Sequence, residues 1–486
     1  MVFSSLTFLF LFLPITICLY YLVRKEIKNY ILLLASLFFY AYGGVKYLYV
    51  MILSISANYI FGILVYRAKQ VESKRLHRRG IRRYTISNYI VNNSKLIVFI
   101  TIVFNLSMIG YYKYSNFFIS NVNSIFKVDI KALNIIMPIG ISFFTFQSLS
   151  YVIDVYRGHG QVQKNPLNVA LYISLFPQLI AGPIVRYETV AEQIFHREET
   201  IDGFIQGIER FIFGLGKKVL ISNAMGVIAD TIFKADVNNI AVMTSWIGAI
   251  AYTFQIYFDF SGYSDMAIGL GKMFGFDFLE NFNYPYISKS ITEFWRRWHI
   301  SLSTWFRDYV YIPLGGNRGT LLKHIRNIFI VWFLTGMWHG ASWTFIAWGL
   351  YYGTILTLEK YVLNKHLQKL STPLKHVYTL IIVIIGWVLF RAESFSEAFG
   401  FIKTMLCMNG AKLIDNQGLF FLGEYKIEII AAIIGCIPLC KFIDSKFNKH
   451  TNIYTVLKHV YLCIIFGLCI ISLVKSSFNP FIYFRF

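Results

Sequence analysis

Long apolar runs constrain this chain more than any other feature of its sequence. A membrane-spanning helix needs about 20 mainly apolar residues, and residues 3–23 form one such run. Residues 30–66 are long enough for two passes, with Gly43, Gly44 and Lys46 marking the break between them. Further apolar stretches cover residues 96–112, 133–155, 242–270, 328–358, 377–390, 427–439 and 460–474. We therefore predict an all-α polytopic membrane protein with about 10–12 transmembrane helices.

Two other apolar stretches are interrupted. Residues 167–184 contain two prolines and a glycine, which favours a re-entrant or kinked segment surrounded by protein. Residues 205–229 are interrupted by glycines and by two lysines. No segment between the apolar runs is long enough for a separate enzyme, so we expect one integral membrane domain over residues 1–486.

Charge predicts the orientation. The chain has 46 Lys and Arg against 25 Asp and Glu, a net charge of +21, although only 15% of its residues are charged. In a soluble chain this excess would indicate nucleic-acid binding, but in a chain this apolar it indicates cytoplasmic loops near anionic lipid. Basic residues gather at 24–28 and at 67–95. Both segments are therefore expected in the cytoplasm, with the N-terminus outside, membrane lipids as partners and no nucleic acid.

Residues 292–319 are too polar and too aromatic for a plain span. Three tryptophans, four arginines and His299 alternate with aliphatic residues, as in segments that lie at the lipid headgroup level. An interfacial helix without a catalytic task is therefore one interpretation. The turn that contains Asn317 and Arg318 favours another, because its backbone amides and guanidinium suit an anionic ligand.

His339 is a second candidate site residue. It lies in the apolar stretch 332–352, between Gly336 and Gly340, and an ionisable group within a membrane segment indicates function. Small neighbours would allow another helix or a thin acyl group to approach the ring. A desolvated imidazole favours the neutral form that a general base needs. A neutral histidine hydrogen-bonded in the core is the alternative interpretation.

Other catalytic chemistries find little support. Asp259 and Asp265 could coordinate a cation or orient a histidine, and could equally pair with the abundant arginines. The sequence contains no HExxH, GxSxG or GxxxxGK[ST] motif, which disfavours a zinc hydrolase, a serine esterase and an ATP-driven pump. We expect no metal and no tightly bound cofactor.

Four segments together carry a family resemblance. The segments are FQIYFDFSGYSDMAIGLGKMFGF (254–276), FWRRWHISLSTWFRDYVYIPLGGNRG (294–319), MWHGASWTFIAWG (337–349) and NPFIYFRF (479–486). In these segments the chain resembles the membrane-bound O-acyltransferase (MBOAT) family, in the bacterial branch typified by alginate O-acetyltransferase. A branch that transfers D-alanine to teichoic acids is a more distant match.

The resemblance implies a fold and a catalytic pair. The family fold is a ring of helices around a thin membrane core with a central tunnel. By position, His339 matches the catalytic histidine and is expected to act as general base. His299 matches the family's second histidine and is expected to orient the donor or to stabilise charge.

The resemblance also implies the reaction. An acetyl group would move from a cytoplasmic thioester, acetyl-CoA or an acyl carrier protein, across the bacterial cytoplasmic (inner) membrane to an extracellular or cell-wall polysaccharide. An exported serine-esterase-like partner would complete the transfer. Five residues suit the mouth that receives the anionic donor: Arg296, Arg297, Arg307, Asn317 and Arg318.

Three alternatives stay open. Transfer of D-alanine or another acyl group to teichoic acid or another envelope polymer is the nearest. A transporter or lipid flippase would require paired inverted broken helices, and the sequence shows no symmetric pair. A scaffold for a polysaccharide synthase would tolerate changes at both His299 and His339.

Overall fold

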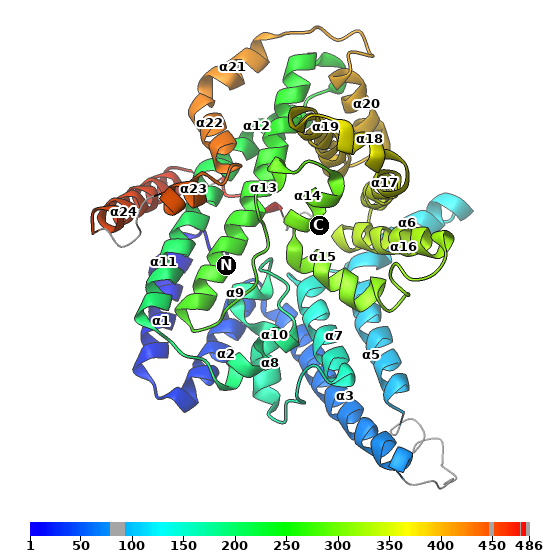
Figure 1. Cartoon of the computed structure of the whole chain (residues 1–486), viewed down its shortest axis with the longest axis vertical. Helices are drawn as coiled ribbons and strands as arrows, with labels where there is room; N and C mark the ends of the chain where they lie inside the picture. The colour runs from blue at the N-terminus through cyan, green and yellow to red at the C-terminus, as the bar shows by residue number, and fades with distance from the viewer. Residues whose placement is uncertain (78–92, 447–451, 477, 483–486) are drawn as a thin grey trace. The chain divides into compact units, whose positions relative to one another are not determined.

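Helices form the regular secondary structure of this protein in the computed structural model (Figure 1). The structure describes residues 1–77, 93–446, 452–476 and 478–482. No β-strand occurs among these residues, and the prediction of an all-α polytopic membrane protein is confirmed. The basic residues 78–83 of the predicted cytoplasmic loop lie outside the described residues.

The chain forms two compact units whose segments alternate along the sequence. Their boundaries are Met1–Ile208 with Ala267–Leu279 for the first unit, and Glu209–Met266 with Glu280–Phe486 for the second. Two long helices contribute residues to both units, α11 (Ile201–Gly216) and α13 (Val242–Met273). The expectation of a single integral membrane domain stays a prediction.

The first unit consists of helices joined mostly by short connections; η denotes a π- or 3₁₀-helical segment. In chain order they are η1 (Phe8–Phe12), α1 (Leu13–Leu22), α2 (Lys25–Ala41), α3 (Val45–His77), α5 (Ser94–Ile109), η2 (Gly110–Tyr114), α6 (Ser115–Phe126), α7 (Ile141–Arg157), α8 (Pro166–Ser174), α9 (Phe176–Leu179), α10 (Tyr187–Phe195) and the first half of α11. Helix α3 packs against α5 and α7. The buried amides of Asn58 on α3 and Asn105 on α5 exchange hydrogen bonds of 3.2 and 2.8 Å, which join these apolar helices.

The predicted break between the second and third helices is confirmed. Helix α2 ends at Ala41 and α3 begins at Val45. Gly44 has φ +146°, a conformation that L side chains rarely adopt, so the chain needs a glycine at this turn. The interrupted stretch 167–184 is also divided, since α8 and α9 are separate short helices.

The second unit contains the remaining helices. After the second half of α11 they are η3 (Lys217–Ser222), α12 (Asn223–Phe233), η4 (Val237–Asn239), most of α13, η5 (Pro285–Ile287), α14 (Ile291–Arg297), α15 (Ile300–Phe306), η6 (Arg307–Tyr311), α16 (Leu321–His339), α17 (Trp343–Leu358), η7 (Glu359–Leu363), α18 (Asn364–Lys369), α19 (Thr372–Arg391), α20 (Phe395–Met405), α21 (Asn416–Glu424), α22 (Lys426–Gly435), α23 (Leu439–Lys446) and α24 (Asn452–Lys475). The lysines expected to interrupt residues 205–229 lie in η3, so a π-helical segment continues the helix there instead of breaking it.

Helices α16 and α17 form a tightly packed hairpin. A side chain at Gly336 of α16 would collide with the backbone of α17 at Phe345, and one at Gly349 of α17 would collide with the carbonyl of Trp332. These glycines therefore allow the two backbones to approach closely, as small residues do in membrane helix pairs. The small residues near His339 thus admit a helix, which is one of the two possibilities expected from the sequence.

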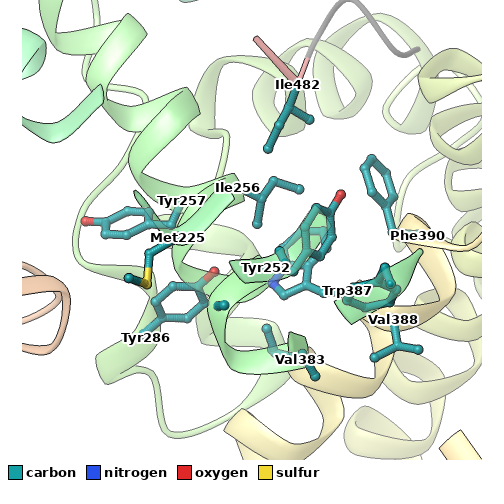
Figure 2. Close-up of a cluster of buried hydrophobic side chains, with 14 of the residues drawn as sticks. Met225, Tyr252, Ile256, Tyr257, Tyr286, Val383, Trp387, Val388, Phe390 and Ile482 are labelled. Atoms are coloured by element: carbon teal, nitrogen blue, oxygen red, sulfur yellow. The ribbon is translucent and has the colours of Figure 1, made fainter. Parts of the chain in front are cut away.

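An aromatic core fills the second unit. Figure 2 shows Met225 of α12, Tyr252 of α13, and Trp387 and Phe390 of α19 around one interior, with Ile482 at its edge. Trp387 is 1% exposed and Tyr252 is 2% exposed. Ile482 is also buried, so the segment after α24 forms part of this core.

Five helical stretches of the described residues are long and apolar enough to cross a membrane. They are Val45–Ser73, Ser94–Phe126, Ile201–Phe233, Thr372–Arg391 and Ile453–Lys475. About 10–12 spans were expected from hydropathy alone. The difference arises partly because two predicted runs are divided: residues 133–140 precede α7 without being helical, and the run 328–358 is interrupted between His339 and Trp343.

Candidate active site

His339 is the last residue of α16, at the interruption of the hairpin. It is 9% exposed, and Gly340 after it is in an extended conformation. Three aromatic rings lie edge-on around the imidazole: Trp338 at 4.9 Å, and Trp348 and Phe390 at 5.0 Å between ring centroids. Helices α16, α17 and α19 therefore each supply a ring to one apolar box, which holds the imidazole away from bulk water.

His299 lies between two short helices. Helix α14 ends at Arg297 and α15 begins at Ile300, and His299 itself has φ 44° and ψ 54°, the left-handed region. Such a conformation is uncommon for a residue other than glycine and persists only where its surroundings enforce it. The side chain is 1% exposed and lies edge-on to the ring of Phe260, 4.5 Å away.

The structure brings the two predicted catalytic histidines together. Trp338 lies beside both rings, with its centroid 5.9 Å from that of His299 and 4.9 Å from that of His339. Residues that are 40 positions apart in the sequence thus belong to one buried cluster in the second unit.

A cavity of about 630 Å³ lies in the same unit, bordered by the N-terminal end of α16. We call it the basic cavity, because four lysines or arginines line it: Lys289, Arg296, Lys360 and Lys375. Its one acidic lining residue, Glu359, is buried and accepts hydrogen bonds from the backbone amides of Ile291 and Thr292 at 2.6 and 2.9 Å. The lining therefore carries a net positive charge that suits an anionic ligand.

His324 also lines the basic cavity. Burial and the nearby Lys360 ammonium lower its pKa below the ordinary value of 6.5. Lys360 Nζ lies 3.4 Å from Nε2 of this ring, while Nδ1 faces the hydroxyl of Tyr361. Because an ammonium group can only donate, Nε2 is the acceptor and Nδ1 carries the proton.

Aromatic contacts connect the basic cavity with His339. Trp332 lines the cavity, and its ring lies 6.1 Å from that of Trp348. Trp348 in turn contacts His339 at 5.0 Å. One layer of tryptophans therefore separates the charged lining from the buried imidazole.

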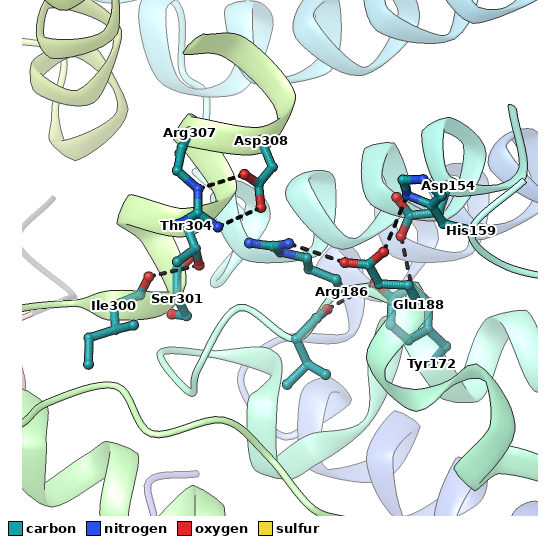
Figure 3. Close-up of polar contacts among 11 residues, drawn as sticks. Asp154, His159, Tyr172, Arg186, Glu188, Ile300, Ser301, Thr304, Arg307 and Asp308 are labelled. Atoms are coloured by element: carbon teal, nitrogen blue, oxygen red, sulfur yellow. Dashed lines mark hydrogen bonds and ion pairs between the residues drawn. The ribbon is translucent and has the colours of Figure 1, made fainter. Parts of the chain in front are cut away.

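The five predicted donor-binding residues occupy different surroundings, and their role in donor binding stays a prediction. Arg296 lines the basic cavity. Arg297 is paired with Glu293 at 2.9 Å and donates to the carbonyl of Asn283. Arg307 is exposed and forms two hydrogen bonds with Asp308, at 2.7 and 3.1 Å (Figure 3).

Asn317 and Arg318 are exposed in the turn before α16. The backbone amides of Gly315, Gly316 and Arg318 already donate to carbonyls of the same turn or of the residues just before it. Binding of an anion at this turn would therefore depend on the side chains of Asn317 and Arg318 more than on these amides. Asn327 of α16 holds the turn in place by donating to the carbonyl of Gly316 at 3.0 Å.

The two aspartates of α13 pair with basic side chains of α11 and η3. Asp259 lies 2.5 Å from Lys218 Nζ, and Asp265 lies 2.5 Å from Arg210 and 2.7 Å from Lys217. Of the interpretations left open by the sequence, pairing with basic residues is the one observed, although two of the three partners are lysines.

Known proteins similar to this chain indicate its family. The model of the membrane-bound O-acyltransferase family matches residues 161–395. A probable alginate O-acetylase of Azotobacter vinelandii is 39% identical over the full length of both chains. The chain belongs to the membrane-bound O-acyltransferase family.

Other relatives show the range of reactions in this MBOAT group. A peptidoglycan O-acetyltransferase of Helicobacter pylori is 32% identical over 100% of this chain and 98% of its own length. A teichoic acid D-alanyltransferase of Bacillus subtilis is 32% identical over 54% of this chain and 70% of its own length. The resemblance seen in the sequence is confirmed, and the protein is an O-acyltransferase.

Several residues of this candidate site were not predicted from the sequence. Lys289, Lys360 and Lys375 come from three separate segments, and no spacing rule connects them. His324 was not among the site residues predicted from the sequence. Asn281, which contacts His299, lies between the recognisable segments 254–276 and 294–319 and belongs to neither.

Proposed function

We propose that this protein moves an acetyl group from a cytoplasmic thioester donor across the bacterial cytoplasmic membrane for O-acetylation of an extracellular or cell-wall polysaccharide. The observation that carries the proposal is the buried cluster of His299 and His339 in the unit that also contains the basic cavity. Full-length similarity to proteins named as probable alginate O-acetylases supports acetyl as the transferred group.

His339 acts as general base in this proposal. It removes the proton of the attacking hydroxyl, on the acceptor or on a relay nucleophile, as the hydroxyl oxygen bonds to the thioester carbonyl carbon. The carbon–sulfur bond then breaks, and the imidazolium returns the proton to the leaving thiolate. The products are an acetyl ester and a free thiol. His299 assists by orienting the donor or by stabilising charge near the reacting carbonyl.

The basic cavity receives the donor. Both donor types, coenzyme A and an acyl carrier protein, carry their thioester on a phosphate-containing arm, and phosphate binds well to arginine and lysine. The four permanent cations of the lining face one carboxylate, so they retain attraction for such an arm. Trp332 and Trp348 lie between this lining and His339, and in this proposal the thioester end of the arm passes beside them to reach the imidazole.

The basic cavity faces the cytoplasm in this proposal. The connection between α17 and α19 contains Lys360, Lys365 and Lys369, and Lys375 follows in the first turn of α19; segments rich in lysine stay on the cytoplasmic side. The basic segment 24–28 places the N-terminus outside by the same rule. The acceptor polysaccharide and an exported serine-esterase-like partner, which completes the transfer, lie on the opposite side.

The test compares cells that contain wild-type protein with cells that contain His339→Ala at equal membrane abundance. Their envelope polysaccharide is isolated and treated with mild base, and released acetate and D-alanine are quantified. We expect acetate to fall to background in His339→Ala. Substitution of the exposed His366 on α18 by alanine is the matched control and should leave acetate unchanged.

Other outcomes of this test would assign the protein a different function. Loss of D-alanine in place of acetate would identify a D-alanyltransferase, in line with the Bacillus subtilis relative. Unchanged release of both would remove His339 from catalysis and favour a transporter or a scaffold. Acetate that is lost only when a candidate esterase gene is deleted would identify the exported partner.

A further inference from the structure

A buried asparagine holds both the backbone and the ring of His299. Asn281 is 0% exposed, and its own carbonyl accepts the amide of Ile300 at 2.9 Å. Its side-chain oxygen, Oδ1, accepts the amide of Ser301 at 3.2 Å and the hydroxyl of Ser301 at 2.9 Å. Nδ1 of His299 lies 3.1 Å from the same oxygen.

The backbone contact fixes the orientation of the Asn281 amide. The oxygen and nitrogen of an asparagine side chain can be exchanged by a flip of the amide, and hydrogen-bond partners decide between the two orientations. The N–H of Ser301 can only donate, so the atom facing it is the amide oxygen. The amide nitrogen then points the other way, where it donates to Ser264 Oγ of α13 at 3.1 Å.

This orientation determines which nitrogen of His299 carries the proton. An amide oxygen has no hydrogen to give, so a hydrogen bond between it and Nδ1 requires the proton on Nδ1. In a neutral imidazole the lone pair is then on Nε2.

We propose that Asn281 is a positioning residue that fixes the Nδ1–H tautomer of His299 and so presents the Nε2 lone pair toward the reacting groups. With Nε2 as an acceptor, His299 can accept a hydrogen bond beside Trp338 and His339. Of the two roles proposed for His299, this favours orienting the donor, because a lone pair does not stabilise negative charge on the carbonyl oxygen. This role of the lone pair rests on the proposed function, whereas the tautomer itself does not.

The strained backbone supports the same assignment. His299 is the N-cap position of α15, and its own side chain makes no capping hydrogen bond. Asn281 satisfies the first two amides of α15 in its place, one with each oxygen. The left-handed conformation of His299 and the direction of its ring therefore have one common cause, a residue 18 positions earlier.

Nitrogen-15 NMR of the full-length protein in lipid, labelled at histidine, measures the tautomer directly. The His299 signals are identified by their loss in His299→Gln. We expect an Nδ1–H, Nε2-unprotonated pattern for His299. An Nε2–H pattern would overturn the proposal, and this experiment requires neither activity nor an Asn281 variant that folds.

Two substitutions test the consequence for catalysis. Asn281→Leu removes the acceptor, and we expect kcat to fall by between about tenfold and the 10⁴-fold that a wrong histidine tautomer costs in serine proteases. Asn281→Asp retains an acceptor, so it should keep activity within about tenfold of wild type. Its carboxylate also favours the imidazolium, which moves the acidic limb of kcat/KM to higher pH by about one unit or more. His339 is the other titratable group beside the ring, so the profile is also measured in the His339→Gln background.

Ser264→Ala is the matched control. It removes only the partner of the Asn281 nitrogen and leaves the acceptor in place, so kcat should fall no more than about threefold. Equal rates in Asn281→Leu and wild type would contradict the positioning role. A wild-type rate in His299→Ala would instead contradict the proposed function of His299 while the NMR result stands.

Discussion

Basic side chains of the second unit occur in two contrasting surroundings. On α11 and η3, Arg210, Lys217 and Lys218 are matched by the carboxylates of Asp259 and Asp265. Each of these cations has an acidic partner within 2.7 Å, so their charges are neutralised by groups of the protein itself.

The basic cavity differs in its balance of charge. Four cations face a single carboxylate there, and two backbone amides already occupy that carboxylate. The comparison teaches that the number of basic residues does not identify a binding site in a chain with a net charge of +21. A cluster of basic side chains with few nearby carboxylates is the better indication of a binding site. Substitutions in the two surroundings should therefore have different effects.

The largest effect is expected at Asp259. Its pair with Lys218 is almost fully buried, with side-chain exposures of 2% and 3%. Asp259→Asn keeps an acceptor for the amide of Ile482 but leaves the Lys218 charge unmatched, so the free energy of unfolding should fall by about 3–5 kcal/mol. Heating in detergent followed by size-exclusion chromatography measures the loss. Adding Lys218→Met should restore most of the stability, and failure to do so would mean that charge is not the cause.

Removal of two cations from the basic cavity should affect binding and not folding. In Arg296→Ala with Lys375→Ala, the KM for acetyl-CoA should rise by about 30- to 1,000-fold, because two charge-assisted contacts of about 1–2 kcal/mol each are lost. Thermal stability should stay at the wild-type value. Lys365→Ala, an exposed residue outside the lining, is the control. An unchanged KM would show that the donor binds elsewhere.

An intermediate loss of stability is expected at Asp265. Asp265→Asn weakens the contacts with Arg210 and Lys217, but Arg210 keeps Glu280 at 2.6 Å. These basic partners are also 33% and 16% exposed, so water replaces part of the lost interaction. The free energy of unfolding should fall by about 1–2 kcal/mol. A loss equal to that of Asp259→Asn would contradict the importance of burial.

The smallest effect is expected at Arg307. Its guanidinium is 58% exposed and already paired with Asp308, so Arg307→Ala should change stability by less than about 0.5 kcal/mol. If Arg307 also attracts the donor, its partner weakens that attraction, and the KM for acetyl-CoA should rise no more than about threefold. A rise equal to that of the cavity double variant would place the donor mouth at Arg307.

Local signals in the sequence predicted the features that depend on neighbouring residues. The break after α2 follows from two adjacent glycines, and both histidines stand in recognisable motifs. His339 was nevertheless expected within a continuous span, whereas it ends α16. The hydropathy of residues 328–358 contains no sign of this interruption, because Gly340, Ala341 and Ser342 between His339 and Trp343 bring no charge into the run.

Features that depend on tertiary contacts could not be predicted. The basic cavity combines residues up to 86 positions apart, from Lys289 to Lys375, and a lysine at a helix end looks the same in sequence whether it lines a cavity or faces solvent. Pairing of the α13 aspartates with lysines depends on how α11 and η3 face α13. The role of Asn281 depends on the contact of its side-chain oxygen with His299, 18 positions later, which no local pattern in the sequence indicates.

Two hydrogen bonds between residues 480–482 and the Lys218–Asp259 pair have a consequence for biosynthesis. The carbonyl of Pro480 accepts a hydrogen bond from Lys218, and the amide of Ile482 donates to Asp259 at 2.8 Å. Ile482 follows Asp259 by 223 residues, so Lys218 and Asp259 are synthesised well before their partners at 480–482. The buried pair therefore receives these two hydrogen bonds only late in translation. A bulky fusion near residues 480–482, or their removal, would prevent these late hydrogen bonds to Lys218 and Asp259.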